Sequence, residues 1–113
     1  MIENLLGLKE TSREDIIAIL DDADRMKSEI LMQDVKKSDI LKGKGIITLF
    51  FENSTRTRVS FEMASKYLGA TAANISAGGS SISKGETLID TVKTLEAMAT
   101  DVIIIRHSMS GAP

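Results

Sequence analysis

Apolar and polar positions follow two periods along the chain, and each period predicts a different kind of element. Apolar runs at residues 46–51, interrupted only by Thr48, and at residues 102–105 are typical of buried strands in a parallel sheet. A weaker run at residues 71–75 predicts another strand. Residues 57–68 and 86–99 carry apolar side chains at helical spacing. Strands that alternate with helices predict an α/β fold, with a parallel sheet flanked by helices.

The first part of the chain predicts one long helix. Ser12 is a good N-cap residue, and the acidic residues that follow it suit the first turn. The apolar stripe of this helix runs to about Gln33 and consists of Ile16, Leu20, Ala23, Met26, Ile30 and Leu31. For the other two helices, the expected inner faces are Val59, Met63 and Tyr67, with Phe61, Ala64 and Leu68 beside them, and Leu88, Val92, Leu95 and Ala99.

Composition narrows the classes of protein to which this chain can belong. The 113 residues make one small domain or part of a larger protein, and the net charge of −2 does not indicate nucleic acid or an anionic membrane as a partner. The absence of cysteine and the single histidine, His107, argue against a disulfide framework and a zinc site. There is neither a signal-peptide pattern nor an apolar run that could span a bilayer, so we expect a cytoplasmic protein. Because the sequence stops soon after a strand, we expect a fragment.

The junction between the first apolar run and the helix after it carries the strongest chemical signal. Residues 50–62 read Phe-Phe-Glu-Asn-Ser-Thr-Arg-Thr-Arg-Val-Ser-Phe-Glu, so a strand leads through a polar turn into a helix. Free backbone N–H groups and the positive end of the helix dipole favour an anion there. Hydroxyls at Ser54, Thr55 and Thr57 and guanidinium groups at Arg56 and Arg58 fit phosphate oxygens. The junction therefore predicts a phosphate site.

A purely structural interpretation exists for the same residues. Ser or Thr before a helix is common as an N-cap, with Glu62 available to the first turns, and helix arginines are usually solvated. Cations at a helix N-terminus oppose the dipole, however, by roughly 0.3–1 kcal/mol each unless an anion compensates. That penalty favours the anion site over simple capping.

Two further cations follow strand ends. Lys84 lies in a Ser/Gly-rich loop, predicted to be mobile, over residues 76–85, and Arg106 directly follows the last strand. Carboxyl ends of parallel strands meet at one sheet edge, so Arg56, Lys84 and Arg106 are expected to converge around a small dianion. The chain contains neither Gly-x-Gly-x-x-Gly nor Gly-x-x-x-x-Gly-Lys-Ser/Thr, which argues against dinucleotides and nucleoside triphosphates.

These motifs resemble a known family. Residues 50–62 resemble the carbamoyl-phosphate signature of the transcarbamylases. Residues 80–88, Ser-Ser-Ile-Ser-Lys-Gly-Glu-Thr-Leu, and 105–107, Ile-Arg-His, narrow the resemblance to the catalytic chains of the aspartate branch. The likeness runs in one register from about Leu5 to the last residue, so residues 1–113 are expected to be the N-terminal portion of the carbamoyl-phosphate-binding domain.

The resemblance implies transfer of a carbamoyl group from carbamoyl phosphate to the amino group of L-aspartate, a step of pyrimidine biosynthesis. It implies that Ser54, Thr55, Arg56 and Thr57 hold the phosphate, and that Thr57 and Arg106 also reach the carbonyl oxygen. Ser81 (or Ser80) and Lys84 would enter the active site of a neighbouring subunit in a homotrimer. Members of the family use no metal and no cofactor.

The resemblance also sets limits and leaves alternatives. An essential histidine and the aspartate-binding residues of a second domain would lie outside this chain, so the chain alone is expected to be inactive. A non-catalytic anion-binding or assembly module and an ornithine-type transferase stay open, as does the attachment of regulatory chains. Arg58 is a candidate for a structural ion pair with Glu52 or Glu86, and His107 is assigned neither a structural nor a catalytic role.

Overall fold

The structure is a computed structural model, and it describes residues 3–76 and 88–107. The chain divides into two compact units, Met1–Lys36 and Lys37–Pro113. The first unit contains α1 (Arg13–Met26), which continues into a π-helical segment, η1 (Lys27–Leu31). The second unit contains the following elements in chain order: β1 (Gly45–Phe50), α2 (Thr55–Tyr67), β2 (Thr71–Ser76), α3 (Leu88–Ala97) and β3 (Val102–Arg106).

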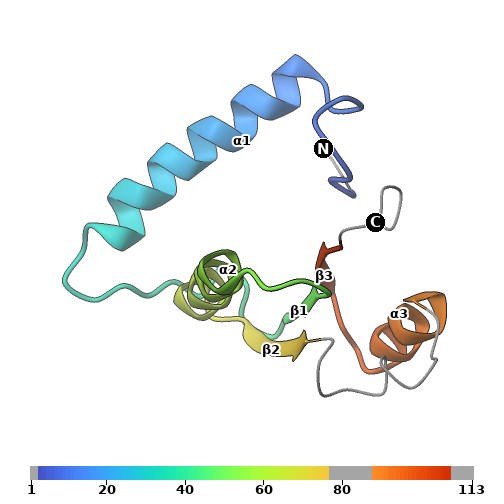
Figure 1. Ribbon diagram of the computed structural model, residues 1–113. Helices are drawn as coiled ribbons and strands as arrows, with labels where there is room; N and C mark the ends of the chain where they lie inside the picture. The colour runs from blue at the N-terminus through green and yellow to red at the C-terminus, as the bar shows by residue number, and fades with distance from the viewer. Residues whose placement is uncertain (1–2, 77–87, 108–113) are drawn as a thin grey trace. The chain divides into compact units, whose positions relative to one another are not determined.

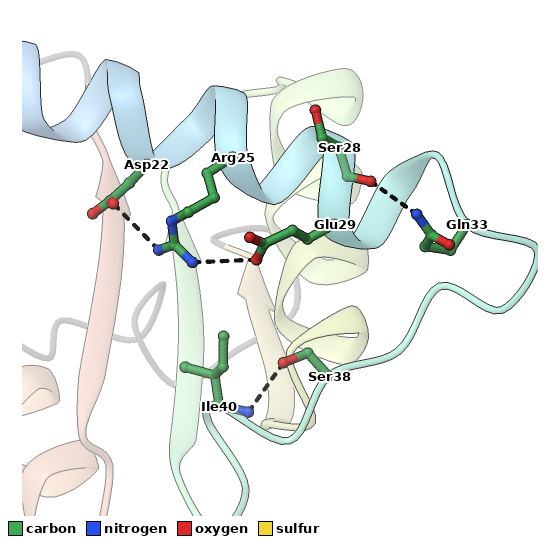
Figure 2. Close-up of polar contacts among 7 residues, drawn as sticks. All are labelled: Asp22, Arg25, Ser28, Glu29, Gln33, Ser38 and Ile40. Atoms are coloured by element: carbon green, nitrogen blue, oxygen red, sulfur yellow. Dashed lines mark hydrogen bonds and ion pairs between the residues drawn. The ribbon is translucent and has the colours of Figure 1, made fainter.

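The predicted long helix of the first unit is confirmed, although its last turns are π-helical. The hydroxyl of Ser12 accepts a hydrogen bond from the backbone N–H of Asp15 over 3.1 Å, which makes Ser12 the predicted N-cap. In the π-helical region, the side-chain amide of Gln33 donates to the carbonyl oxygen of Ser28 over 3.0 Å (Figure 2). A side chain thus satisfies a carbonyl group that the changed helical period leaves free.

Arg25 lies between two carboxylates on this helix (Figure 2). Its guanidinium contacts Asp22 over 3.2 Å and Glu29 over 3.3 Å, one turn to either side. The hydrogen bond to Asp22 and the charges of Glu29 and Asp22 raise the pKa of Arg25. All three side chains are exposed, so the arrangement is typical of a solvated helix face.

The second unit is a three-stranded parallel sheet in the order β2-β1-β3 (Figure 1). The chain crosses from β1 through α2 to β2, and then from β2 through α3 back past β1 to β3. Such crossovers are right-handed, and the first moves across the sheet in one direction while the second moves back in the other. α2 and α3 therefore lie on opposite faces of the sheet, as Figure 1 shows. The predicted α/β class, with its parallel sheet and flanking helices, is confirmed.

β1 forms the centre of the core because it is paired on both sides. Leu49 is completely buried, and Ile46 and Phe50 are nearly so. Thr48 is also buried, and its hydroxyl donates to the side-chain oxygen of Asn74 on β2 over 2.8 Å. This bond satisfies the polar group inside the sheet and helps to fix the register of β1 and β2.

The predicted inner face of α2 is partly right, because Tyr67 and Leu68 are half-buried as expected. Val59, Phe61 and Met63 are each 41% exposed, whereas Ser65 is buried. The hydroxyl of Ser65 donates to the carbonyl oxygen of Phe61 over 2.8 Å, so the small polar side chain is satisfied where the helix packs.

The predicted inner face of α3 is partly right. Leu95 is buried and Leu88 and Val92 are half-buried, as expected, but Thr91 is buried as well. Ala99 is not on the inner face because α3 ends at Ala97. Ala99 adopts the left-handed conformation with a φ of 62°, where the chain turns back toward β3. Residues 77–87, between β2 and α3, lie outside the described residues. They include all of the predicted Ser/Gly loop except Ser76, which is the last residue of β2.

Candidate functional site

The three strands of the second unit end at the same edge of the sheet. In the register, Phe50 of β1 pairs with Ser76 of β2 on one side and with Arg106 of β3 on the other. The backbone N–H of Phe51 donates to the carbonyl oxygen of Arg106 over 2.8 Å, so the pairing of β1 with β3 extends one residue past β1. α2 begins four residues later, at Thr55. Residues 51–57 and Arg106 are therefore neighbours, as the sequence predicted.

Arg106 is the residue that joins these segments. Its Nε donates to Oε1 of Glu52 over 2.8 Å, and one of its terminal nitrogens donates to the hydroxyl of Thr57 over 3.4 Å. The side chains of Arg106 and Glu52 are 44% and 40% exposed, so their ion pair adds little to stability. The contact with Thr57 brings two of the predicted site residues, 49 positions apart in sequence, within hydrogen-bonding distance.

The N-terminus of α2 is not capped by its own side chains. Ser54 holds the N-cap position, and its carbonyl oxygen accepts the first helical hydrogen bond, from Arg58 N–H over 3.0 Å. Its hydroxyl makes no capping bond, in contrast to the hydroxyl of Ser12 at α1. Acidic residues occupy the first turn of α1, but none occupies the first turn of α2. A helix start without a side-chain cap or a carboxylate suits an external anion.

The two arginines in the first turn of α2 differ in their surroundings. Arg56 is exposed, and it forms no ion pair with any residue in the ranges 3–76 and 88–107. Arg58 is half-buried, and its Nε is buried without a hydrogen-bond partner. The predicted pairing of Arg58 with Glu52 is wrong, because Glu52 pairs with Arg106. The other partner considered for Arg58, Glu86, lies outside the described residues.

The predicted site residues thus divide into two groups. Ser54, Thr55, Arg56 and Thr57 follow one another at the start of α2, and Arg106 contacts the last of them. Ser81 and Lys84 lie outside the described residues, so their expected convergence on this edge stays a prediction. Contact between Arg106 and Thr57 indicates that the described group is a single site at the sheet edge.

Sequence reasoning missed Glu52 as the partner of Arg106. The signal was present, because a carboxylate two residues past one strand lies close to an arginine at the end of the neighbouring strand. It also missed the contact between the rings of Phe51 and His107, whose centroids are 4.6 Å apart with an interplanar angle of 56°. That contact places the ring of His107 against the residue that precedes Glu52.

In the described part of the chain, no group of three or more His, Asp or Glu side chains could hold a metal ion. No helix in the same ranges is long and apolar enough to cross a membrane.

Relatives of known identity resemble this chain over nearly its whole length. Residues 3–112 match the family described as aspartate/ornithine carbamoyltransferase, carbamoyl-P binding domain. The aspartate carbamoyltransferase catalytic subunit of Acetivibrio thermocellus is 63% identical over 111 residues, which are 98% of this chain and 35% of that protein. The chain therefore spans about a third of the length of such relatives.

Solved structures agree with this match. The catalytic subunit of M. jannaschii aspartate transcarbamoylase superposes with a TM-score of 0.85 at 39% identity, covering 98% of this chain and 36% of that one. Aspartate transcarbamoylase from Trypanosoma cruzi, in complex with carbamoyl phosphate and aspartate, gives a TM-score of 0.79 at 38% identity, covering 92% and 32%. With its sheet, its arginine-rich helix start and its match over residues 3–112, the chain belongs to the aspartate/ornithine carbamoyltransferase family, in the part that forms the carbamoyl-phosphate-binding domain.

Proposed function

We propose that this chain binds carbamoyl phosphate at the edge of its sheet, and that it is the carbamoyl-phosphate-binding part of an aspartate carbamoyltransferase. The complete enzyme would transfer the carbamoyl group to the amino group of L-aspartate, with N-carbamoyl-L-aspartate and phosphate as products. Relatives named as aspartate carbamoyltransferases, among them one that is 63% identical, favour aspartate over ornithine as the acceptor.

The observation that carries the proposal is the contact between Arg106 and Thr57 over 3.4 Å. It joins the end of β3 to the first turn of α2, where a helix start has neither a carboxylate nor a side-chain cap. A guanidinium, hydroxyl groups and the free end of a helix dipole together offer several donors to one anion. The structural alternative, in which Ser54 merely caps the helix, is weakened because its hydroxyl makes no capping bond.

Each residue of the site has a proposed role. Ser54, Thr55, Arg56 and Thr57 hold the phosphate at the start of α2. Thr57 and Arg106 also donate to the carbonyl oxygen of carbamoyl phosphate. Ser81 and Lys84 contribute from a loop that a neighbouring subunit of a homotrimer supplies. These roles follow from the family resemblance, and for Thr57 and Arg106 their contact supports a shared ligand.

The proposed chemistry needs the donors that this site offers. When the amine attacks the carbonyl carbon, the new C–N bond forms and negative charge develops on the carbonyl oxygen. The bond from that carbon to the phosphate oxygen then breaks, the charge moves to the departing phosphate, and the nitrogen loses a proton. Fixed donors aimed at both oxygens lower the barrier, and the loss of one such donor typically slows a reaction by about 100- to 1000-fold. No metal or cofactor is required for these reaction steps.

The remaining requirements are assigned to parts of the protein outside this chain. The chain spans 35% of the Acetivibrio thermocellus subunit, and the family resemblance implies that the aspartate-binding residues belong to a second domain. A cytoplasmic homotrimer that works in pyrimidine biosynthesis is the proposed setting. The chain alone is accordingly expected to bind carbamoyl phosphate weakly and to leave aspartate unconverted.

Titration of the ¹⁵N-labelled chain with carbamoyl phosphate and with phosphate tests the binding step. Backbone shifts concentrated at Ser54–Arg58 and Arg106 are expected, while residues of α1 serve as the internal control. Shifts that are absent, or spread evenly over the chain, would contradict the proposed site.

The full reaction is tested in a protein that joins this chain to the downstream part of its relatives. Carbamoyl-aspartate is the expected product when both substrates are supplied. Citrulline formed from ornithine would instead indicate an ornithine-type enzyme. Binding of phosphate without any transfer by a well-folded protein would support a non-catalytic anion-binding module.

A further inference from the structure

The rings of Phe51 and His107 form a contact between the residues next to Glu52 and Arg106 in sequence. Their centroids lie 4.6 Å apart, and the rings are inclined by 56°, an arrangement in the range that aromatic pairs prefer. Both residues are half-buried. Phe51 immediately precedes Glu52, and His107 immediately follows Arg106, so each ring is the sequence neighbour of one member of the Glu52–Arg106 ion pair.

The backbone explains why the two rings meet. Phe50 and Arg106 are register partners, and the N–H of Phe51 donates to the carbonyl oxygen of Arg106 over 2.8 Å. Phe51 and His107 are therefore the next pair along the two strands, in positions where side chains of parallel neighbours lie together. The ring contact and the hydrogen bond connect the β1–α2 connection to the end of β3. They lie where the hydrogen-bond ladder between β1 and β3 ends.

We propose that the Phe51–His107 ring pair is a positioning element for Arg106, which holds its guanidinium within reach of Thr57 for the anion. This inference rests on the proposed function, because the anion it serves is the phosphate group of carbamoyl phosphate. Arg106 is exposed and is the last residue of β3, so the ladder with β1 holds the chain only as far as its carbonyl oxygen. A small displacement of the Arg106 guanidinium would weaken its interaction with the anion strongly. Loss of the ring pair should therefore change the affinity for phosphate measurably.

Ring removal and ring replacement at His107 test the inference in the 113-residue chain. In His107→Ala the ring pair is lost, and we expect phosphate to bind about 5-fold more weakly, which is part of what a charged donor such as Arg106 contributes. In His107→Phe the pair is kept, and we expect binding within 2-fold of the unmodified chain. Phe51→Leu and Phe51→Tyr form the same comparison from the other side, if a His107 variant fails to fold.

A second readout does not depend on binding. The Nε–H of Arg106 donates to Glu52, so its ¹⁵N–¹H signal reports on the position of the guanidinium. We expect this signal to shift or broaden in His107→Ala and to be restored in His107→Phe. Ile46→Val, a small cavity mutation at the opposite end of β1, controls for lost stability and is expected to leave the signal unchanged.

The outcomes separate this inference from the proposed function. An unmodified chain that binds neither phosphate nor carbamoyl phosphate would overturn the proposed function, and the Arg106 signal would still decide the positioning role. Equal Arg106 signals in the unmodified chain and His107→Ala would overturn the positioning role. Loss of the signal in Ile46→Val as well as in His107→Ala would also overturn it, since general destabilisation would then explain both.

Discussion

Arg106 and Glu52, 54 positions apart in sequence, form an ion pair of 2.8 Å at the carboxyl edge of the sheet. The same guanidinium contacts the hydroxyl of Thr57 over 3.4 Å. Arg106 therefore has one donor engaged by a carboxylate and another directed to the start of α2. An anion that uses Nε of Arg106 must compete with Glu52, which makes the carboxylate a negative influence on anion binding in this chain.

We predict that Glu52→Gln strengthens phosphate binding by this chain about 2- to 5-fold. The change removes a competing negative charge, and the pair is partly exposed, so the gain is limited to what exposed ion pairs contribute. Titration followed by NMR measures the effect. Glu96→Gln makes the same change of charge on the exposed side of α3 and is expected to have no effect. Weaker binding in Glu52→Gln would show that the carboxylate helps to orient Arg106.

We predict that Arg106→Gln weakens phosphate binding about 10-fold or more, with little change in the free energy of unfolding. The anion loses a charged donor, worth roughly 1.5–3 kcal/mol in a typical protein hydrogen bond. Stability should hold, because an exposed ion pair contributes little.

Arg25→Gln is the matched control for Arg106→Gln. Arg25 also contacts carboxylates on an exposed surface, but it lies on α1, outside the site. We expect unchanged phosphate affinity in this variant. Equal losses in both variants would mean that the chain attracts phosphate only through its overall charge.

The two N-cap serines are predicted to respond in opposite ways to the same change. Ser12→Ala removes a capping hydrogen bond of 3.1 Å and should lower the free energy of unfolding by about 1 kcal/mol without affecting phosphate binding. Ser54→Ala removes a hydroxyl that makes no capping bond, so phosphate binding should weaken while stability stays within about 0.5 kcal/mol. Urea denaturation and phosphate titration of both variants give the comparison. A loss of about 1 kcal/mol in Ser54→Ala would favour the simple capping role.

Ala99→Gly is predicted to stabilise the chain by about 1 kcal/mol. Ala99 has a φ of 62°, a conformation that costs a residue with a Cβ roughly 1–2 kcal/mol and costs glycine almost nothing, although glycine loses more entropy on folding. Thermal denaturation measures the change.

Gly69→Ala is the converse variant. Gly69 has a φ of 84°, and an added Cβ would approach the carbonyl oxygen of Ser38 to 2.8 Å. We expect this substitution to destabilise the chain by more than Ala99→Gly stabilises it, because a clash with backbone adds to the strain. Stabilisation in Gly69→Ala would show that the connection at Ser38 moves freely away from α2.

Periodicity predicted the elements well and their orientation less well. The strands and helices appear within a few residues of their expected bounds, because apolar runs and helical spacing are local properties of the sequence. The predicted face of α2 was only partly right, with Tyr67 and Leu68 half-buried but Val59 and Met63 exposed and Ser65 buried, because the apolar stripe alone does not decide which side of a helix meets the sheet. Helix packing depends on where the chain enters the helix as well as on where its apolar residues lie.

Sequence alone predicted a phosphate site and the position of its residues at the sheet edge. The sequence Ser-Thr-Arg-Thr-Arg after a buried strand specifies hydroxyls, cations and a helix start within five residues. These features depend only on residues that are adjacent in sequence. Only the tertiary structure decided that Arg106 meets Glu52 and Thr57, and that Phe51 lies against His107. Those contacts join residues about 50 positions apart, so they depend on strand order and register, which are set by the packing of the whole sheet and by no short stretch of the chain.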